Sequence, residues 1–157
     1  MESLTRIASF SVNHDFITEG IYVSRIDGDV TTYDMRTRIP NNCDDDYMSN
    51  LTMHSFEHLF ATYVRNSEIG QRVIYFGPMG CQTGFYLLVR NSDNDETLAA
   101  VKSVLKKIIA HDGEMPGAKR EECGNYKNLD LESARIEARR YLAILDGKEN
   151  DFKYPEA

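Results

Sequence analysis

The chain has 157 residues, of which 41% are hydrophobic and 27% are charged, and its formal net charge is -7 at pH 7. This balance predicts one soluble globular domain spanning residues 1–157, and no apolar run reaches the roughly 18 residues that a membrane helix requires. The acidic charge and the lack of a Lys/Arg cluster argue against nucleic-acid binding. The N-terminal sequence has no signal-peptide pattern, so we expect a cytoplasmic protein that acts on small molecules or other proteins.

The first part of the chain predicts an extended arm followed by a β-hairpin. Residues 1–20 have no clear periodicity. Residues 20–26 are rich in β-branched and aromatic side chains, residues 30–38 alternate between apolar and polar, and the turn at 27–29 joins them as two strands. Pro40 and the Asn- and Asp-rich run that follows it predict a polar loop.

A helix is predicted from Thr52 to Asn66, because its apolar residues recur at helical spacing. Ser49 or Thr52 is available as the N-cap. The apolar stripe is expected to pack on a sheet and to leave an adjoining polar face open to a cleft. This stripe consists of Met53, Phe56, Phe60, Tyr63 and Val64.

The second part of the chain predicts two more strands and then two helices. The strands are residues 72–76 and 85–90, and a turn with three glycines and one proline joins them. The helices are residues 98–109 and 130–146, with a charged loop at 114–128 between them. The tail after Gly147 is expected to be frayed. Hairpin-compatible connections and the lack of βαβ alternation favour an α+β domain in which an antiparallel sheet packs against helices.

His54, Glu57 and His58 form an HxxEH pattern on the first predicted long helix. Residues four apart lie about 6 Å apart along a helix axis and on nearly the same side, so both imidazoles can reach one divalent metal. Metallopeptidases use this order of residues as well as the reverse order. The alternative is that the two histidines are ordinary half-buried helix residues.

The three cysteines are too few for a disulfide scaffold, so we expect free thiols in a reducing compartment. Cys123 lies in a polar loop and is the best candidate for a third metal ligand, which would leave one coordination position open. A His2Cys ligand set suits zinc, ferrous iron or cobalt better than magnesium or calcium. Cys43 stands beside three aspartates, which raise a thiol pKa, and is expected to be a surface residue without function.

Cys81 ends the Gly-Pro-Met-Gly turn, where an exposed thiol can be held near a site. The alternative is a buried cysteine with no chemical role. Glu57 has three possible roles: it can orient a histidine, pair with Arg65, or act as a general acid/base beside the metal.

Taken together, these motifs resemble the S-ribosylhomocysteine lyases, the LuxS family that generates the precursor of autoinducer-2. The matching segments occur in family order over nearly the whole chain: Ser9-Phe10 with His14, Asp34-Met35-Arg36 with Pro40-Asn41, His54-Ser55-Phe56-Glu57-His58, Pro78 to Tyr86 (PMGCQTGFY), and Pro116 followed by Glu122-Cys123-Gly124. Tyr75 departs from the pattern, because members of the family often carry an aspartate at this position.

The resemblance implies a homodimer with active sites at the subunit interface, each holding one divalent metal through His54, His58 and Cys123. Ferrous iron is the expected ion, zinc or cobalt can replace it, and no organic cofactor is needed. The implied reaction cleaves S-ribosylhomocysteine to homocysteine and 4,5-dihydroxy-2,3-pentanedione. This product serves quorum sensing, and the reaction also recycles a by-product of methyl transfer.

The same resemblance gives roles to six further residues. Cys81 and Glu57 are expected to be the general bases and acids that move protons on the sugar. The substrate-binding residues are expected to be Ser9, His14, Arg36 and Arg65, with Arg65 near the homocysteine end.

Two other classes of function stay open at this stage. One is an HxxEH metallopeptidase in which Glu57 activates water and Glu132 or Glu137 supplies an acidic third ligand. The other is a non-enzymatic binding module whose metal is closed by His14 as a fourth protein ligand.

Overall fold

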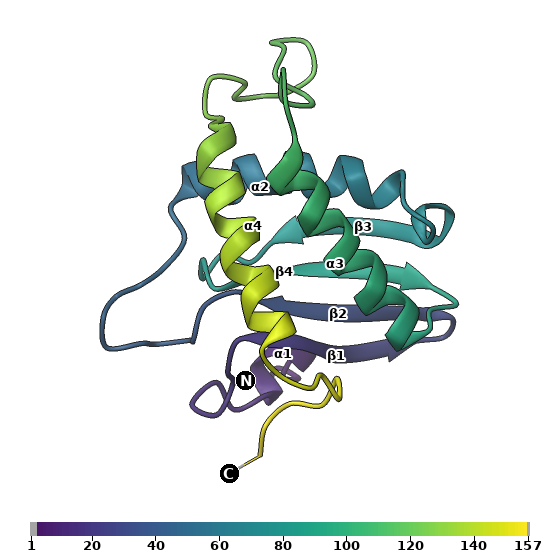
Figure 1. Ribbon diagram of the computed structural model, residues 1–157. Helices are drawn as coiled ribbons and strands as arrows, with labels where there is room; N and C mark the ends of the chain where they lie inside the picture. The colour runs from purple at the N-terminus through teal and green to yellow at the C-terminus, as the bar shows by residue number, and fades with distance from the viewer. Residues whose placement is uncertain (1–2, 157) are drawn as a thin grey trace.

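A computed structural model describes residues 3–156 of the chain and contains four strands in one sheet. Figure 1 shows the elements in chain order: α1 (Ala8–Ser11), β1 (Gly20–Asp27), β2 (Val30–Arg36), α2 (Asn50–Arg65), a 3-10 turn (Gly70–Arg72), β3 (Val73–Pro78), β4 (Gly84–Arg90), α3 (Asn94–Ala110) and α4 (Leu131–Asp146). The predicted order of two strands, a helix, two strands and two helices is therefore confirmed. The expected extended arm contains the short helix α1.

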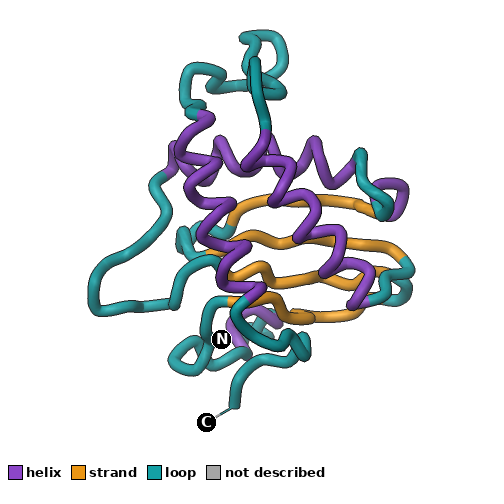
Figure 2. Tube along the Cα trace, in the orientation of Figure 1, coloured by secondary structure: helices purple, strands orange, loops and turns teal. Residues whose placement is uncertain are grey.

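The sheet has the order β1-β2-β4-β3 and is antiparallel throughout. The predicted hairpin pairs Asp27 with Val30, and β3 returns through its turn so that Pro78 pairs with Phe85. The two hairpins pair with each other through β2 and β4. The second strand of each hairpin therefore lies at the centre of the sheet, and β1 and β3 form its edges. In Figure 2 the long helices lie over one face of the strands. This arrangement confirms the predicted α+β domain.

An aromatic cluster joins helix α2 to the sheet. The rings of Phe60 and Phe76 are 4.4 Å apart, those of Phe56 and Phe85 are 4.8 Å apart, and all four side chains are at most 6% exposed. Stacked aromatic pairs at these separations add to the free energy gained from burial alone. The predicted apolar stripe therefore fixes which side of α2 faces the sheet and which side is left for the polar motif.

Side-chain caps begin each long helix. Ser49 accepts a hydrogen bond from the Thr52 amide, Asp93 accepts one from Glu96, and Asp130 accepts one from Ser133. Each cap satisfies one of the amide groups that the first helical turn leaves without a partner. Ser49, one of the two predicted caps, is thus the N-cap of α2.

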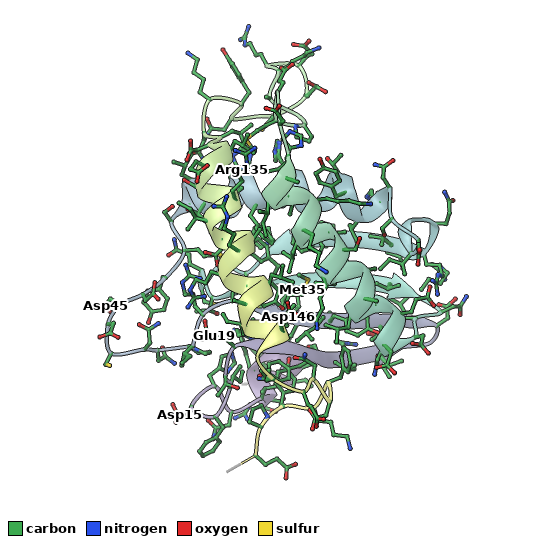
Figure 3. All side chains as sticks on the ribbon, in the orientation of Figure 1. Asp15, Glu19, Met35, Asp45, Arg135 and Asp146 are labelled. Carbon is green, nitrogen blue, oxygen red and sulfur yellow. The ribbon has the colours of Figure 1, made fainter. Side chains whose placement is uncertain are left out.

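The loop at 37–49, which contains the predicted polar run after Pro40, is held to helix α4 by a buried ion pair. The Arg38 guanidinium donates to both carboxylate oxygens of Glu137 at 2.5 and 2.8 Å, and both side chains are at most 10% exposed. Asp46 accepts a further bond from Arg38 at 3.1 Å. Asp45 lies at the outer side of the loop, away from the helices (Figure 3).

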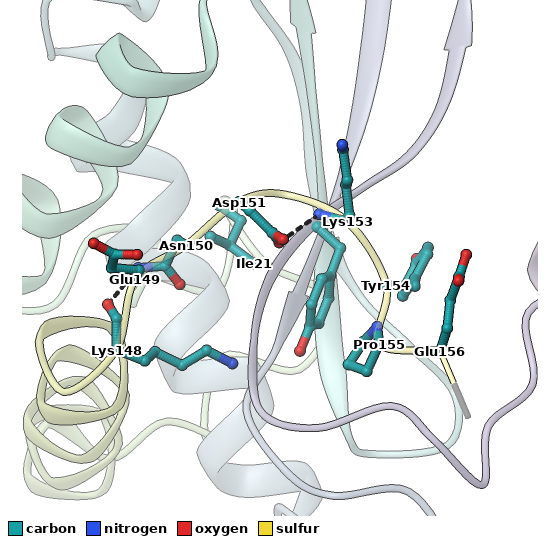
Figure 4. Close-up of a pocket in the computed structure, with 10 residues that line it drawn as sticks. Ile21, Lys148, Glu149, Asn150, Asp151, Lys153, Tyr154, Pro155 and Glu156 are labelled. Carbon is teal, nitrogen blue, oxygen red and sulfur yellow. Dashed lines mark hydrogen bonds between the residues drawn. The ribbon is translucent and has the colours of Figure 1, made fainter.

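The prediction of a frayed tail after Gly147 is wrong. Phe152 is 6% exposed and its carbonyl accepts a hydrogen bond from the Val23 amide at 2.8 Å. Tyr154 stacks on Tyr22 with ring centroids 4.9 Å apart. Figure 4 shows the segment from Lys148 to Glu156 crossing the edge strand β1. Sequence periodicity does not detect such a tail, because the tail is held by long-range contacts and not by a helix or a long strand.

Candidate metal centre and thiol site

His54, His58 and Cys123 converge on one point, and their ligand atoms all lie within 4.8 Å of one another. The Cys123 sulfur is 3.4 Å from His54 Nε2. Two ligands of a tetrahedral zinc ion, at bond lengths near 2.0 Å for nitrogen and 2.3 Å for sulfur, stand about 3.5 Å apart. The donor set and its spacing therefore fit a borderline divalent metal such as zinc or ferrous iron.

Backbone carbonyls hold both histidine rings from the side away from this point. His54 Nδ1 donates to the Asn128 carbonyl at 2.7 Å, and His58 Nδ1 donates to the Pro116 carbonyl at 2.8 Å. A carbonyl only accepts, so each ring donates from Nδ1 and leaves Nε2 as the nitrogen that faces the point of convergence. Such outer partners fix the orientation of metal-binding histidines and increase their basicity.

The loop from 111 to 130 supplies these carbonyls as well as Cys123, and it is anchored to α2. The Ser55 hydroxyl accepts from the Asp130 amide at 2.8 Å, and the Asn128 side chain donates to Asn50 at 2.6 Å. Gly117 has φ +69°, and its Cα approaches the His58 ring so closely that a Cβ would stand 2.7 Å from Nδ1. The α2 face and the loop therefore form one unit.

Glu57 lies on the same face of α2, in a cleft of about 240 Å³ beside the candidate metal centre. The cleft is lined by Asn50, Met53, His54, Glu57, Pro78, Asn125 and Asn128. Arg65 does not pair with Glu57, because its guanidinium donates to the carbonyls of Val73 and Ile74 at 3.2 and 3.0 Å. Pro78 begins the turn that carries Cys81, so this cleft adjoins the thiol-bearing turn.

The turn between β3 and β4 exposes the Cys81 thiol. The residue with left-handed backbone geometry in it is Gln82 with φ +65°, rather than one of the glycines that we expected to shape the turn. Gln82 is held by two reciprocal hydrogen bonds to Met48, just before α2 begins. The Cys81 sulfur is 2.9 Å from the Thr83 hydroxyl.

A buried ion pair stands behind the thiol. Arg36 donates to both carboxylate oxygens of Asp34 at 3.1 and 2.6 Å and to the Thr83 hydroxyl at 2.7 Å. Both charged residues are at most 2% exposed. Burial lowers the pKa of Arg36, but the Asp34 carboxylate together with smaller contributions from Cys81 and Tyr154 outweighs burial, so the net pKa is raised.

The other predicted site residues lie on the N-terminal arm or on the surface. Ser9 lies beside Tyr86 of β4, on the sheet face opposite the long helices, where burial and the Asp34 charge raise the pKa of Tyr86. His14 is half-buried and its Nδ1 bonds the Val12 carbonyl at 2.9 Å. Cys43 is exposed, as expected for a surface thiol.

The carboxylates that the peptidase alternative requires are engaged elsewhere. Glu137 is buried against Arg38, and Glu132 lies 3.8 and 3.6 Å from the guanidinium groups of Arg135 and Arg139. Among residues 3–156, the group of potential metal ligands contains His54, His58 and Cys123 alone. His14 is therefore not placed as a fourth ligand within this chain.

The sequence is similar to those of one known protein family over nearly its whole length. A family model described as S-ribosylhomocysteinase (LuxS) matches residues 7–151. The chain belongs to the LuxS family. Relatives named S-ribosylhomocysteine lyase include those of Borreliella burgdorferi (40% identity), Finegoldia magna (39%) and Borreliella afzelii (38%). Each alignment covers 97 to 98% of this chain and 100% of the relative.

The LuxS chain also contains site residues that sequence reasoning missed. Thr83 bridges Cys81 and Arg36, Asp34 balances the Arg36 charge, and Tyr154 bonds Asp34 from the tail. Only the Asp34 and Arg36 pair left a signal in the sequence, because residues two apart on a strand share one face.

No described helix is both long and apolar enough to cross a membrane.

Proposed function

We propose that this LuxS-family chain is an S-ribosylhomocysteine lyase, which cleaves its substrate to homocysteine and 4,5-dihydroxy-2,3-pentanedione, the precursor of autoinducer-2. The observation that carries the proposal is the convergence of His54, His58 and Cys123 beside Glu57 in a chain of this family. A reaction of this kind needs a Lewis acid and proton-transfer groups but no redox cofactor. We place the enzyme in the cytoplasm.

The resident metal is proposed to be one divalent ion per subunit, Fe²⁺ in preference to Zn²⁺ or Co²⁺. His54 Nε2, His58 Nε2 and the Cys123 thiolate would hold it, and the three ligands leave a position for substrate. When bound, the metal supplies Lewis acidity that stabilises negative charge developing on substrate oxygens.

The protein's own part of the reaction is a series of proton transfers. The substrate carbonyl has to move from C1 to C2 and then to C3 before loss of the C4 proton can expel the homocysteine sulfur from C5. Cys81 Sγ and a Glu57 carboxylate oxygen would take protons from one carbon and return them to the next. Arg36 is joined to Cys81 through the Thr83 hydroxyl and places a positive charge behind the sulfur, and a nearby cation is the setting that favours a reactive thiol.

We further propose that two copies of the chain form the working enzyme. The three long helices cover only one face of the sheet (Figure 1), and the other face carries a groove of about 300 Å³. This groove includes Tyr75, which is 54% exposed, together with Tyr86 and Leu88. Ser9 also lies there. We assign Ser9, His14 and Arg36 to the sugar hydroxyls or the Cys81 thiolate, with the buried Arg36 on the side of the thiolate, and Arg65 to the homocysteine end. Sedimentation at equilibrium tests the dimer.

The lyase proposal is tested by an anaerobic assay of homocysteine release from S-ribosylhomocysteine, with Fe²⁺-loaded protein and a thiol reagent as readout. Cys81→Ala is expected to keep its metal and to lose turnover by about 100-fold or more, the usual effect of removing a general base. Cys43→Ser is the control, because this exposed thiol lies outside the site. A Cys81→Ala variant with the parent rate would refute the mechanism, and a parent that releases no homocysteine would refute the function.

A further inference from the structure

The C-terminal segment turns around the edge of the sheet and reaches both of its faces. Phe152 has φ +63° and lies against Tyr33 on the helix side, with ring centroids 6.0 Å apart. Tyr154 lies two residues later on the opposite side, stacked on Tyr22. The left-handed backbone at Phe152 redirects the chain, because a regular strand would put residues 152 and 154 on the same face. Figure 4 shows Tyr154 beside β1.

A continuous series of hydrogen bonds runs from Tyr154 to the candidate acid/base Cys81. The Tyr154 hydroxyl donates to Asp34 Oδ2 at 2.7 Å, and the same oxygen accepts from the Arg36 guanidinium at 2.6 Å. Arg36 then donates to the Thr83 hydroxyl, which lies 2.9 Å from the Cys81 sulfur. Asp34 is fully buried, so these groups are its means of balancing a charge that water cannot reach.

The position of Tyr154 in this series determines how much of the Arg36 charge acts on Cys81. A carboxylate that also accepts a hydrogen bond from a phenol attracts a guanidinium less strongly than a carboxylate that has the guanidinium as its only partner. Without the Tyr154 hydroxyl, Asp34 would keep more unbalanced negative charge close to the sulfur. Both effects disfavour a thiolate at Cys81.

We propose that Tyr154 is a positioning residue for the thiol site: its hydroxyl holds the Asp34 carboxylate so that Arg36 stays directed at Thr83 and Cys81. The C-terminal segment thereby becomes part of the active-site support. This inference deepens the proposed function and rests on it for the role of Cys81 in catalysis.

The surroundings of Tyr154 keep its hydroxyl protonated. Burial raises the pKa of Tyr154 far above its ordinary value, and the Asp34 carboxylate raises it further. The phenol therefore donates its hydrogen bond throughout the working pH range. The charged and titratable side chains that act on this cluster are Asp34 and Arg36 of β2, Tyr22 of β1, Tyr86 of β4, Tyr141 of α4, Tyr154 and Cys81 itself.

The test measures how fast iodoacetamide alkylates Cys81 as a function of pH, with the modified peptide identified by mass spectrometry. Zn²⁺-loaded full-length protein in a Cys43→Ser background is compared with its Tyr154→Phe variant, which keeps the ring that stacks on Tyr22. The variant should react about threefold to tenfold more slowly at pH 7. This is less than the loss of a direct hydrogen bond to a charged group would cause, because the effect reaches the sulfur through two other groups. At high pH, where Cys81 is ionised in the parent and in the variant alike, the alkylation rates of the two proteins should converge.

Tyr33→Phe is the matched control. Tyr33 precedes Asp34 on β2, is fully buried, and also loses a bonded hydroxyl, which contacts Ser92 and Asn94 at 2.9 and 2.7 Å on the other side of the sheet. Its alkylation profile should coincide with that of the parent. Equal profiles for Tyr154→Phe and the parent would overturn the proposal. A shift in Tyr33→Phe as large as that in Tyr154→Phe would also overturn it, as would a Tyr154→Phe rate that is slower than the parent rate at every pH.

Homocysteine release by the same proteins separates this inference from the function on which it rests. If the parent is a lyase, the ascending limb of its pH profile for kcat/KM should move to higher pH in Tyr154→Phe and stay in place in Tyr33→Phe. A limb that does not move would overturn the role of Tyr154 in catalysis. If the parent releases no homocysteine, the proposed function fails, and the alkylation profiles still decide whether Tyr154 controls the thiol.

Discussion

Gly117 lies against the ring of His58, at a distance where a Cβ on residue 117 would stand 2.7 Å from Nδ1 and 2.9 Å from Cε1. The neighbouring Pro116 carbonyl is the acceptor that holds this same nitrogen. The absence of a side chain at Gly117 is thus what allows the loop to reach a candidate metal ligand. Its φ of +69° adds a second reason for glycine.

Gly117→Ala should therefore weaken metal binding. The added methyl group displaces either the His58 ring or the Pro116 carbonyl, and loss of such an outer contact reduces metal affinity by about 10-fold to 100-fold. Competition for Zn²⁺ with a chromophoric chelator measures the change. Gly113→Ala is the control, since it has φ +94° in the same loop but nothing within 4 Å of the added Cβ. Equal affinities in the two variants would contradict this account of Gly117.

Cys123→Ala should lose the metal. Two histidines remain, and the thiolate that closes the ligand set is gone. A ligand that binds only the folded state stabilises it by an amount that grows with the logarithm of the ligand concentration over Kd, so metal should raise the Tm of the parent and leave that of the variant nearly unchanged. Metal analysis and thermal unfolding with and without a chelator provide the measurements. Retention of a full equivalent of metal by Cys123→Ala would argue for a different third ligand.

Glu137→Gln should destabilise the fold by about 3 kcal/mol, the usual consequence of leaving one member of a buried ion pair uncompensated. The change would leave the Arg38 guanidinium charged beneath the loop at 37–49. Urea unfolding at pH 7 gives the free energy. Glu132→Gln on the same helix, where the carboxylate is 59% exposed, should change stability by less than about 1 kcal/mol. Metal content should be unchanged in both variants, whereas the peptidase alternative requires a loss.

Asp130→Asn should reduce the sensitivity of the fold to acid. Hydrogen bonds from the Ser133 side chain and amide lower the pKa of the Asp130 carboxyl below its ordinary 3.8. A lowered folded-state pKa contributes stability that is present above pH 3.8 and is lost as the pH falls through the folded value. Asparagine caps a helix without a charge, so the variant lacks this pH dependence. Urea unfolding between pH 3 and pH 6 should give converging stabilities at low pH; parallel curves would contradict the assignment.

The secondary structure was predictable because its signals are local. β-Branched and aromatic residues mark β1, alternation of apolar and polar residues marks β2, and the apolar residues of α2 recur at helical spacing. Each element is therefore encoded within its own segment. The pair His54 and His58 was predictable for the same reason, because helix geometry fixes their separation whatever the rest of the chain does. The role of Glu57 stays a prediction.

The errors have a common physical origin in contacts between residues distant in sequence. The tail after Gly147 looked frayed because Phe152 and Tyr154 are held by β1 and β2, more than 100 residues earlier. The left-handed conformation in the turn before β4 belongs to Gln82, whose bonds to Met48 compensate for the strain. Gly84 is needed for a different reason, because a Cβ there would stand 2.5 Å from the Met35 carbonyl oxygen.

The sequence by itself determined the order of the elements, the metal-binding face of α2 and, through its motifs, the family. Only the tertiary structure decided that the loop at 111–130 delivers Cys123 and two backbone carbonyls to that face. It also joined Tyr154, Asp34 and Arg36 to Cys81 by hydrogen bonds that pass through Thr83. The physical reason is that a helix or strand pattern records only which side of an element is buried. Which distant group meets that side depends on how the elements pack and on where the buried charges find partners.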